Sequence, residues 1–452
     1  MQNSARSSIR GFTLVEIMIA MVIGLILILG IATIFTNTTN NIRLQRGIAT
    51  IQETGRLSVD LMSSDIGGAG SQYCSAINIQ LATNGFTPQR PFLSTVNAPV
   101  PVSGNDDLSE VYNTTASGNT GGLFYGLVTP ADLPPSVPTV PPTPTPLPGS
   151  PYLISARYTL QGHECVGNVC TPALTVLGAG RTSAGATAAT NPAGALPGQR
   201  VPGTDVLTVR TLVGNGASIA NSTALGYSLA PNSLARLGLE AVSAARLANR
   251  LVMIADCNQS AIYRGTFAAP DLLTLTGAPA GSNTAFNQSN NARVFDMENQ
   301  WLTVTYFLQF VADPNSAGRV IPALMRRENG RALEEIARGV ERLDFRYAVN
   351  ARGAAGVNPE NNVVWLNANQ VDNANGGAIA CPPAATGTTE TGCLWRSVTA
   401  VEVGMLANTI DALAINDDRF TYSMANQRNV VAPDRMIHRE FRFVVPIKSW
   451  AR

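Results

Sequence analysis

The chain has 452 residues, enough for two or three domains, and 45% of them are hydrophobic, enough for a packed core. Only 13% are charged and the formal net charge is +1, so the overall charge indicates neither a nucleic-acid nor an acidic-lipid partner. The 40 glycines and 28 prolines are typical of an exported, loop-rich β protein rather than of a cytosolic helical enzyme.

The N-terminus combines a short basic leader with a long apolar run. Residues 1–10 contain Arg6 and Arg10 and no acid, and the 24 residues from Phe12 to Phe35 carry a single charge, Glu16. A run of this length crosses a bilayer as a helix. Because positive charge is retained in the cytoplasm, the leader is expected to stay there while the rest of the chain is exported.

The junction Gly11–Phe12 lies on the near side of the apolar run. A secretory signal peptide has a shorter apolar core and is cut on its far side, whereas a cut here leaves the helix on the mature protein. An ordinary signal anchor is the alternative. Glu16 argues against it, since an acid inside a membrane helix costs a few kcal/mol and is rarely kept without a partner.

The segment GFTLVE at residues 11–16 resembles the N-terminus of type IV prepilins. The resemblance implies that prepilin peptidase cuts after Gly11 and methylates Phe12, and that Glu16 is the fifth mature residue. A buried carboxylate needs a cation, and the amine of Phe12 on a neighbouring subunit is the nearest candidate in a fibre. Glu16 is therefore expected to fix the axial register between subunits.

Prepilins often carry a glycine and a proline where the helix melts in the fibre. Gly24 stands at the glycine position, but Thr33 stands at the proline position, and Gly30 is a weaker substitute. The resemblance therefore does not extend to helix melting.

The helical pattern continues past the apolar run, over residues 37–66. Apolar residues recur close to a helical repeat at Leu44, Ile48, Ile51, Val59, Met62 and Ile66, interrupted by Gly55, and charged residues occupy the other face. Residues 67–70, Gly-Gly-Ala-Gly, end the pattern. A single rod from Phe12 to Ile66 is predicted, roughly 80 Å long, with its second half lying on a sheet.

Beyond residue 70, strand-like runs alternate with low-complexity loops. Six strands are predicted, at Asp205–Thr211, Leu251–Ala255, Trp301–Phe310, Glu341–Val349, Val398–Leu406 and Glu440–Ile447. The loops include the Gly/Ala/Thr-rich segment 178–203, the Asn/Gly-rich segment 350–392 and the Pro-rich insertion 130–151, which has ten prolines. This layout predicts an α+β fold, with the long helix packed on an antiparallel β-sheet that carries long loop insertions. Alternatively, part of the chain beyond residue 70 forms a second β subdomain.

Several stretches resemble the PilW family of minor pilins. They follow the family order: residues 55–74 at the helix end, Asp205–Arg210 and Ala255–Cys257 in the centre, and Gly339–Tyr347, Arg396–Leu406 and Arg439–Pro446 at the C-terminal sheet. The chain is longer than a typical member, and the excess falls in the Pro-rich and Gly/Asn-rich loops.

Six cysteines in an exported chain indicate disulfides. Cys165 with Cys170 and Cys381 with Cys393 are spaced to close local loops, which leaves Cys74 with Cys257 to tie the helix end to the central sheet. Six cysteines allow 15 connectivities, so other pairings stay open. A zinc site at His163, Cys165 and Cys170 is a weaker alternative, because no second clustered pair of ligands follows and the only other histidine is His438.

Signals for catalysis are weak. The sequence has none of the serine-hydrolase, zinc-protease, phosphate-loop or dinucleotide motifs. Glu334 and Glu335 are interpreted as the exposed face of a short helix rather than an acid–base pair, and Asp372–Gly377 as a turn rather than a calcium loop. The chain is thus not expected to be an enzyme, and it suggests no cofactor or metal.

Four regions follow from these patterns. They are a cleaved leader (1–11), a transmembrane or fibre-core helix (12–36), the amphipathic second half of that helix (37–66) and a periplasmic β-rich region (67–452). The resemblance implies a minor pilin that helps initiate a type IV pilus and supports twitching motility, adhesion or DNA uptake. It would lie in the inner membrane with a cytoplasmic N-terminus, and in the fibre at or near the tip.

The resemblance also implies the partners: other minor pilins, the major pilin, prepilin peptidase and the inner-membrane assembly platform. A type II secretion pseudopilin is the second hypothesis, since it shares the N-terminus. A pilus-borne adhesin or DNA-binding module is the third, and it needs a basic or aromatic patch. The nearest candidate, Arg326–Arg331, is more simply interpreted as a charged turn, so nucleic acid is not indicated.

Overall fold

A computed structural model gives the fold. It describes residues 13–71, 73, 79–82, 85–88, 92–93, 152–153, 159–174, 190, 192–248, 250–256, 260–276, 286, 288, 291–314, 316, 318–328, 333–350, 363–379, 392–410, 421–424, 427–431 and 436–447. The Pro-rich insertion 130–151 lies outside these residues.

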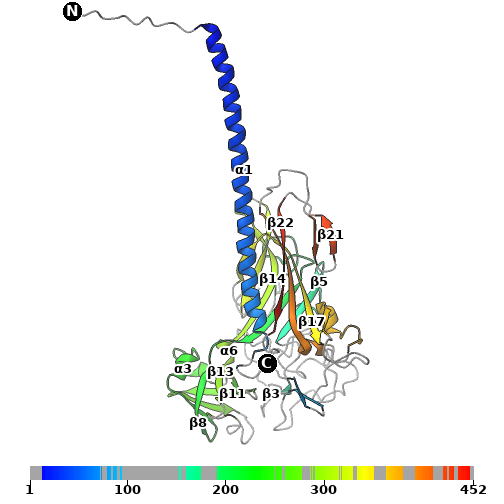
Figure 1. Cartoon of the computed structure of the whole chain (residues 1–452). Coiled ribbons are helices and arrows are strands. Elements are labelled where there is room, and N and C mark those ends of the chain that lie inside the picture. The colour runs from blue at the N-terminus through cyan, green and yellow to red at the C-terminus, as the bar shows by residue number, and fades with distance from the viewer. Residues whose placement is uncertain are drawn as a thin grey trace, which may run out of the picture.

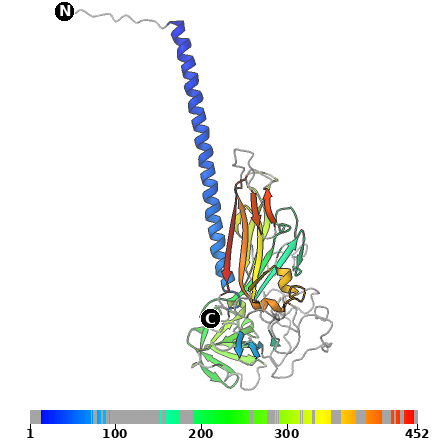
Figure 2. The same cartoon turned by 45° about the vertical axis from the view of Figure 1, so that its right-hand side comes forward.

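A single helix, α1 (Leu14–Gly67), runs away from the β-rich part of the chain for more than half of its length (Figures 1 and 2). Its 54 residues correspond to about 81 Å at the α-helical rise. Thr13 caps its N-terminus, and Gly68 caps its C-terminus. Gly70 follows with a positive φ of 68°. The predicted rod, its second half on β-sheet and its glycine stop are confirmed.

Two antiparallel sheets form the body beside α1. The first has the order β16-β15-β14-β7-β5-β6 and the second the order β18-β17-β19-β22. The strands of the first sheet are β5 (Leu160–Val166), β6 (Val169–Thr171), β7 (Val206–Leu212), β14 (Trp301–Ala312), β15 (Val320–Glu328) and β16 (Leu333–Arg338). Those of the second are β17 (Val340–Asn350), β18 (Val363–Leu366), β19 (Val398–Asn408) and β22 (His438–Pro446).

The two sheets pack on each other around one core. Buried side chains of β7, β14 and β15 meet those of β17 and β19, and Met62 and Ile66 of α1 join them. The helix contacts β22 of one sheet and β16 of the other, which are the end strands of their sheets. Its second half therefore covers one edge of the space between the two sheets, along β22 and β16.

Two local features tie the sheets together. The buried carboxylate of Asp205 accepts hydrogen bonds from the backbone N–H of Cys165 (3.1 Å) and of Phe345 (3.0 Å), one in each sheet. Burial raises the pKa of Asp205 well above its usual range, and the nearby carboxylates of Glu164 and Asp344 add to the effect. At Gly339, with φ of 78°, the chain crosses between the sheets against the backbone of Asn408, where a Cβ would collide.

A second body is inserted between β7 and β14. Its strands are β8 (Ala217–Thr223), β9 (Gly226–Leu229), β10 (Arg250–Ala255), β11 (Ser260–Ala268), β12 (Leu272–Thr276) and β13 (Arg293–Asp296). They pair in the order β10-β13-β8-β9-β12-β11, and β11 pairs again with β10, so that these six strands close a barrel. The barrel has a separate apolar core that includes Tyr227, Phe267 and Phe286. Figure 1 places it at the end of the molecule far from the N-terminus.

The neck of the barrel is held by paired backbone and buried charge. Its two connections start from neighbouring residues of one sheet, since Leu212 of β7 pairs with Trp301 of β14. Arg250 donates two hydrogen bonds to Asp296, at 2.8 and 2.7 Å, and both side chains are almost fully buried. An insertion with adjacent ends leaves the host sheet continuous.

Short elements complete the described chain. They are β1 (Ile79–Ala82), β2 (Gly85–Pro88), β3 (Phe92–Leu93), β4 (Tyr152–Leu153), α3 (Ser233–Arg236), α4 (Ala244–Leu247), α6 (Met297–Gln300), α7 (Ala368–Asp372), the 3₁₀ helix η3 (Cys393–Ser397), β20 (Thr421–Met424) and β21 (Gln427–Val431).

The α+β class and all six predicted strands are confirmed, as β7, β10, β14, β17, β19 and β22. The helix predicted around Glu334 and Glu335 is wrong, because these residues lie in β16, which pairs with β15. The charged turn proposed at Arg326–Arg331 is also wrong at its start. Arg326 and Arg327 belong to β15, and Arg327 is buried.

Candidate functional site

The N-terminal end of α1 is closed by a capping box. The Glu16 backbone N–H donates to Thr13 Oγ1 (3.3 Å), and Glu16 Oε2 accepts from the Thr13 backbone N–H (2.9 Å) and hydroxyl (3.0 Å). Both bonds that Glu16 accepts fall on Oε2, so the described residues leave Oε1 available to another partner. Gly11 and Phe12 lie outside the described residues, so cleavage and methylation stay predictions.

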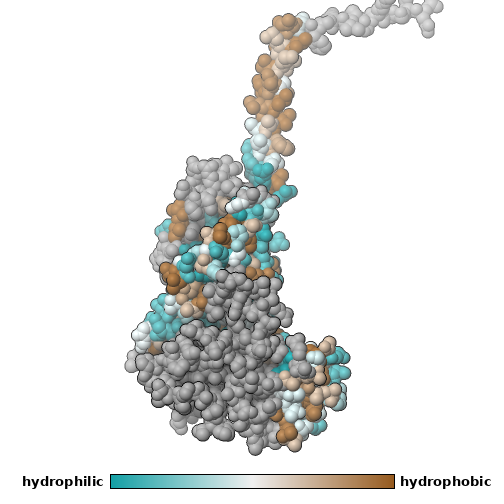
Figure 3. Space-filling model, turned by 180° about the vertical axis from the view of Figure 1, so that it is seen from behind, coloured by the Kyte–Doolittle hydropathy of each residue, from teal (hydrophilic) through white to brown (hydrophobic). Residues whose placement is uncertain are grey.

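The first half of α1 is apolar and has no packing partner among the residues that the structure describes. No residue from Leu14 to Thr36 is buried, and Leu25, Leu29 and Phe35 are 67%, 67% and 71% exposed. The space-filling view shows this half as a hydrophobic column extending from the body (Figure 3). Among the described residues, α1 is the one helix long and apolar enough to cross a membrane.

The second half of α1 packs on the sheets through one buried stripe. Its positions are Ile51, Gly55, Ser58, Met62 and Ile66, with Gly67 at the end of the helix. A Cβ added to Gly55 would overlap the ring of Phe441 on β22, so glycine is needed for the close approach. Gly55 therefore belongs to the stripe, whereas the sequence predicts that it interrupts it. Of the apolar residues predicted for this face, Ile48 is exposed and Val59 is half-buried.

A polar contact fixes the C-terminal end of α1. Asp65 Oδ2 accepts hydrogen bonds from the Tyr306 hydroxyl (2.6 Å) and from Arg326 Nε (2.9 Å), on β14 and β15. Burial and the adjacent Asp65 carboxylate raise the pKa of Tyr306, which keeps its hydroxyl protonated as the donor. Burial alone would lower the pKa of Arg326, but its bonds to Asp65 and Glu328 outweigh burial and raise it.

The sulfur predictions have a mixed outcome. Cys165 and Cys170 form a disulfide across the β5–β6 hairpin, as predicted. Cys74, Cys257 and Cys381 lie outside the described residues, so Cys74–Cys257 and Cys381–Cys393 stay predictions. The disulfide contradicts the zinc alternative, since both sulfurs are used and the Nδ1 of His163 is bonded to the carbonyl of Pro172 at 2.8 Å.

Other candidate positions take structural roles. Asp372–Gly377 forms the end of α7 and a turn, as interpreted, and Asn373 accepts the backbone N–H of Gly376 within it. His438 lies against Glu341 at 3.0 Å. Within the part of the chain that the structure describes, no cluster of three or more His, Cys, Asp or Glu residues could hold a metal ion.

A long helix defines a pilin-like class of protein when its apolar half packs on none of the described residues and its other half rests on antiparallel sheets. Two family comparisons agree with this class. Residues 306–449 match the type IV pilus-assembly protein W family, PilW, and residues 6–32 match the prokaryotic N-terminal methylation motif. A C-terminal segment of the chain is thus similar to the PilW family of type IV pilus-assembly proteins, and its N-terminus carries the prokaryotic methylation motif.

The PilW match contains three of the stretches on which the resemblance rested, 339–347, 396–406 and 439–446. The other three, at 55–74, 205–210 and 255–257, fall outside it. Tyr306 and Arg326, which hold Asp65 of α1, lie inside the matched region. No curated protein and no solved structure matches the chain.

Proposed function

We propose that this protein is a minor pilin that takes part in initiating type IV pilus assembly. The observation that carries the proposal is the division of α1, exposed and apolar over residues 14–36 and seated on PilW-type sheets beyond them. Such a helix half needs a lipid or protein environment that the described part of the chain does not provide. Before assembly the environment is the inner membrane, and afterwards it is the helical core of the fibre.

The N-terminus is processed first in this proposal. Prepilin peptidase cuts after Gly11 and methylates Phe12, which removes Arg6 and Arg10 and leaves the helix at the new terminus. The N-terminal methylation match over residues 6–32 supports this order. The capping box survives the cut, because it uses the N–H of Thr13 rather than that of Phe12.

Glu16 then sets the register of the subunit. Its Oε2 stays on its own helix cap, and its Oε1 accepts the amine of Phe12 from a neighbouring subunit. A carboxylate held in this way has a fixed direction before it meets its partner, which reduces the entropy lost on pairing.

The inserted barrel is an argument that this subunit is rare in the fibre and lies near its tip. It adds width at the end of the molecule far from the N-terminus (Figures 1 and 2), where a pilin stacked beyond this one would have to pack. A subunit of this shape suits a terminal position. The partners are then the major pilin and other minor pilins below it, with the assembly platform in the inner membrane, and support of twitching, adhesion or DNA uptake follows indirectly.

Deletion of the gene tests this function. Surface piliation and twitching are expected to fall, and blocking retraction is expected to restore some fibres, because initiation is slowed rather than abolished. In a complemented strain, mass spectrometry should find a methylated Phe12 as the first residue. Normal piliation with failed protein secretion would favour the pseudopilin hypothesis instead. An intact leader in a strain with active peptidase would contradict the processing step.

The third hypothesis, a binding module, now rests on the barrel rather than on Arg326–Arg331. Arg326 is held by Asp65 and Glu328, so it does not form an exposed basic patch. A chain lacking residues 214–299, joined between β7 and β14, tests this. Adhesion lost with piliation unchanged would favour the binding module.

A further inference from the structure

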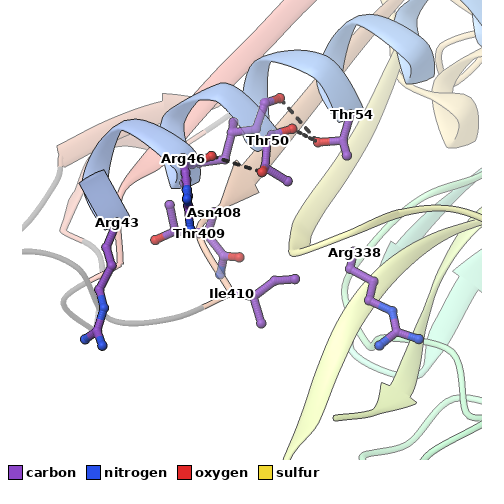
Figure 4. Close-up of a pocket in the computed structure, with 10 residues that line it drawn as sticks. Arg43, Arg46, Thr50, Thr54, Arg338, Asn408, Thr409 and Ile410 are labelled. Atoms are coloured by element: carbon purple, nitrogen blue, oxygen red, sulfur yellow. Dashed lines mark hydrogen bonds between the residues drawn. The ribbon is translucent and has the colours of Figure 1, made fainter. Parts of the chain in front are cut away.

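A cavity lies between α1 and the end of the second sheet nearest the apolar half of the helix. Its volume is about 610 Å³, within the roughly 300–1,000 Å³ typical of small-molecule sites. One face of α1 lines it from Arg43 to Thr54, and Arg338 of β16 and residues 408–410 after β19 line the rest. In Figure 4, Arg43 and Arg338 stand at opposite ends of the cavity, and both guanidinium groups point to the same side.

The lining is cationic. Arg43, Arg46 and Arg338 are all arginines, and none of the ten lining residues is acidic. Arg338 is paired with Glu335. Arg43 and Arg46, by contrast, have no side-chain partner among the described residues, and both are exposed. Two arginines on one helix face, three positions apart, present two planar forks that match a phosphate group.

The inner wall of the cavity is a fixed amide side chain. Asn408 is 6% exposed, and its Nδ2 donates to Glu341 and to the sulfur of Met436. Its Oδ1 is fully buried against Gly339, so it does not face the cavity. The cavity thus offers cations for an anion, carried by the exposed arginines.

The distance to the membrane decides the source of such a ligand. Arg43 and Arg46 follow Phe35, the end of the continuous apolar run, by about 12 and 16 Å along the helix. Helical side chains lean toward the N-terminus, and long arginines near a membrane reach for the interface. The phosphate layer of the periplasmic leaflet therefore lies within their range. The near-neutral net charge of the chain conceals this local patch.

We propose that this cavity binds the headgroup of an anionic phospholipid, with its phosphate on Arg43 and Arg46. The inference rests on the proposed membrane-held stage. Bound lipid would hold the body against the membrane before assembly, and extraction into a fibre would release it. Phosphatidylglycerol carries the phosphate and the net negative charge that the arginine lining favours.

The test uses the full mature chain in nanodiscs of phosphatidylcholine with phosphatidylglycerol. After detergent extraction, lipid mass spectrometry measures how much of each lipid the protein retains. Wild type is expected to retain phosphatidylglycerol selectively. Arg43→Gln and Arg46→Gln are each expected to reduce that retention roughly tenfold, as loss of a charge-assisted hydrogen bond does. Arg56→Gln, on the same helix but outside the cavity, is the matched control and should retain lipid normally.

Four outcomes would overturn the proposal. Equal retention by wild type and the two cavity variants would exclude the site. Equal loss in Arg56→Gln would show a general charge effect. Displacement of phosphatidylglycerol by millimolar inorganic phosphate would show a simple anion site. If no lipid is retained while the cavity variants fail only in fibre assembly, the cavity instead receives an acidic side chain of a neighbouring subunit. Failure of the pilin assignment itself would appear in piliation and N-terminal processing, not in lipid retention.

Discussion

The two halves of α1 have similar backbone conformation and opposite environments. From Leu14 to Thr36 no side chain is buried, while the second half buries a stripe that runs from Ile51 to Ile66. The second half packs on the sheets of its own chain, through the contact of Gly55 with Phe441 and the hydrogen bonds of Asp65. In the proposed function the first half is left for the membrane and for other subunits. The helix then divides at about residue 37 into a half that stabilises the fold and a half that assembles.

The largest expected effect comes from Glu16 in the assembling half. Glu16→Leu removes the acceptor for a neighbour's amine, which leaves a buried charge without compensation in the fibre. We expect the variant to be made, cleaved and held in the membrane normally, but to be depleted roughly a hundredfold in sheared fibres. Quantitative immunoblotting of membrane and sheared fractions measures this.

Glu53→Leu is the control for that substitution. Glu53 is an exposed acid on the other half of the same helix, so its loss should leave incorporation unchanged. If Glu16→Leu enters fibres as efficiently as wild type, the register mechanism is wrong and the helix acts as an anchor only.

The next largest effect is expected at the polar contact of Asp65, near the C-terminal end of α1. Asp65→Ala leaves the buried Tyr306 hydroxyl without its acceptor and Arg326 without one carboxylate. We expect the free energy of unfolding to fall by about 2–3 kcal/mol, measured by denaturant titration of the periplasmic region. Asp60→Ala removes a solvent-exposed pair with Arg56 and should cost less than about 1 kcal/mol. Equal losses in both variants would show that the contact does not anchor the helix.

A smaller effect on stability is expected when one glycine in each half of α1 is replaced by alanine. Gly55→Ala places a methyl group into the Phe441 ring, and overpacking of this kind costs about 1–3 kcal/mol of stability. Gly24→Ala meets nothing within 4 Å in the single chain and should leave the stability of the body unchanged. Thermal unfolding of both variants measures the difference. A stabilised Gly55→Ala would mean that helix propensity outweighs the contact.

The smallest expected effect is that of removing the first half altogether. A chain that starts at Asn37, a favourable N-cap residue, loses no buried side chain. Its free energy of unfolding should equal that of the full chain to within about 0.5 kcal/mol. A large loss of stability would show that the apolar half also contributes to the fold, and the comparison between the halves would fail.

Local patterns were sufficient for the elements that carry strong periodicity. The helix to Ile66 and six strands follow from spacing and β-branched content, and the Cys165–Cys170 pair follows from a short loop. The pattern around Glu334 and Glu335 predicted a helix, but pairing with β15 places these residues in a strand. Pairing with the preceding strand thus overrides the local helical propensity.

The barrel was less accessible to sequence analysis. Its one predicted strand, Leu251–Ala255, is now β10, and a second β subdomain was only an alternative. Closure of the barrel depends on β11, which pairs with β10 on one side and with β12 on the other. It also depends on the pairing of β8 with β13, two strands that lie far apart in the sequence. No short window of sequence specifies such contacts.

The sequence by itself determined the first 70 residues of this protein: a basic leader, a glycine junction, one acid in an apolar run, and a helix that stops at glycines. These features act through local periodicity and transfer to the membrane, so neighbouring residues are enough to define them. Only the tertiary structure decided the rest. Gly55 is a contact residue of the helix rather than a gap in its apolar stripe, because Phe441, distant in sequence, lies against it. Arg326 changes from a turn residue into the partner of Asp65 for the same reason, since both roles depend on contacts that form only when the sheets assemble.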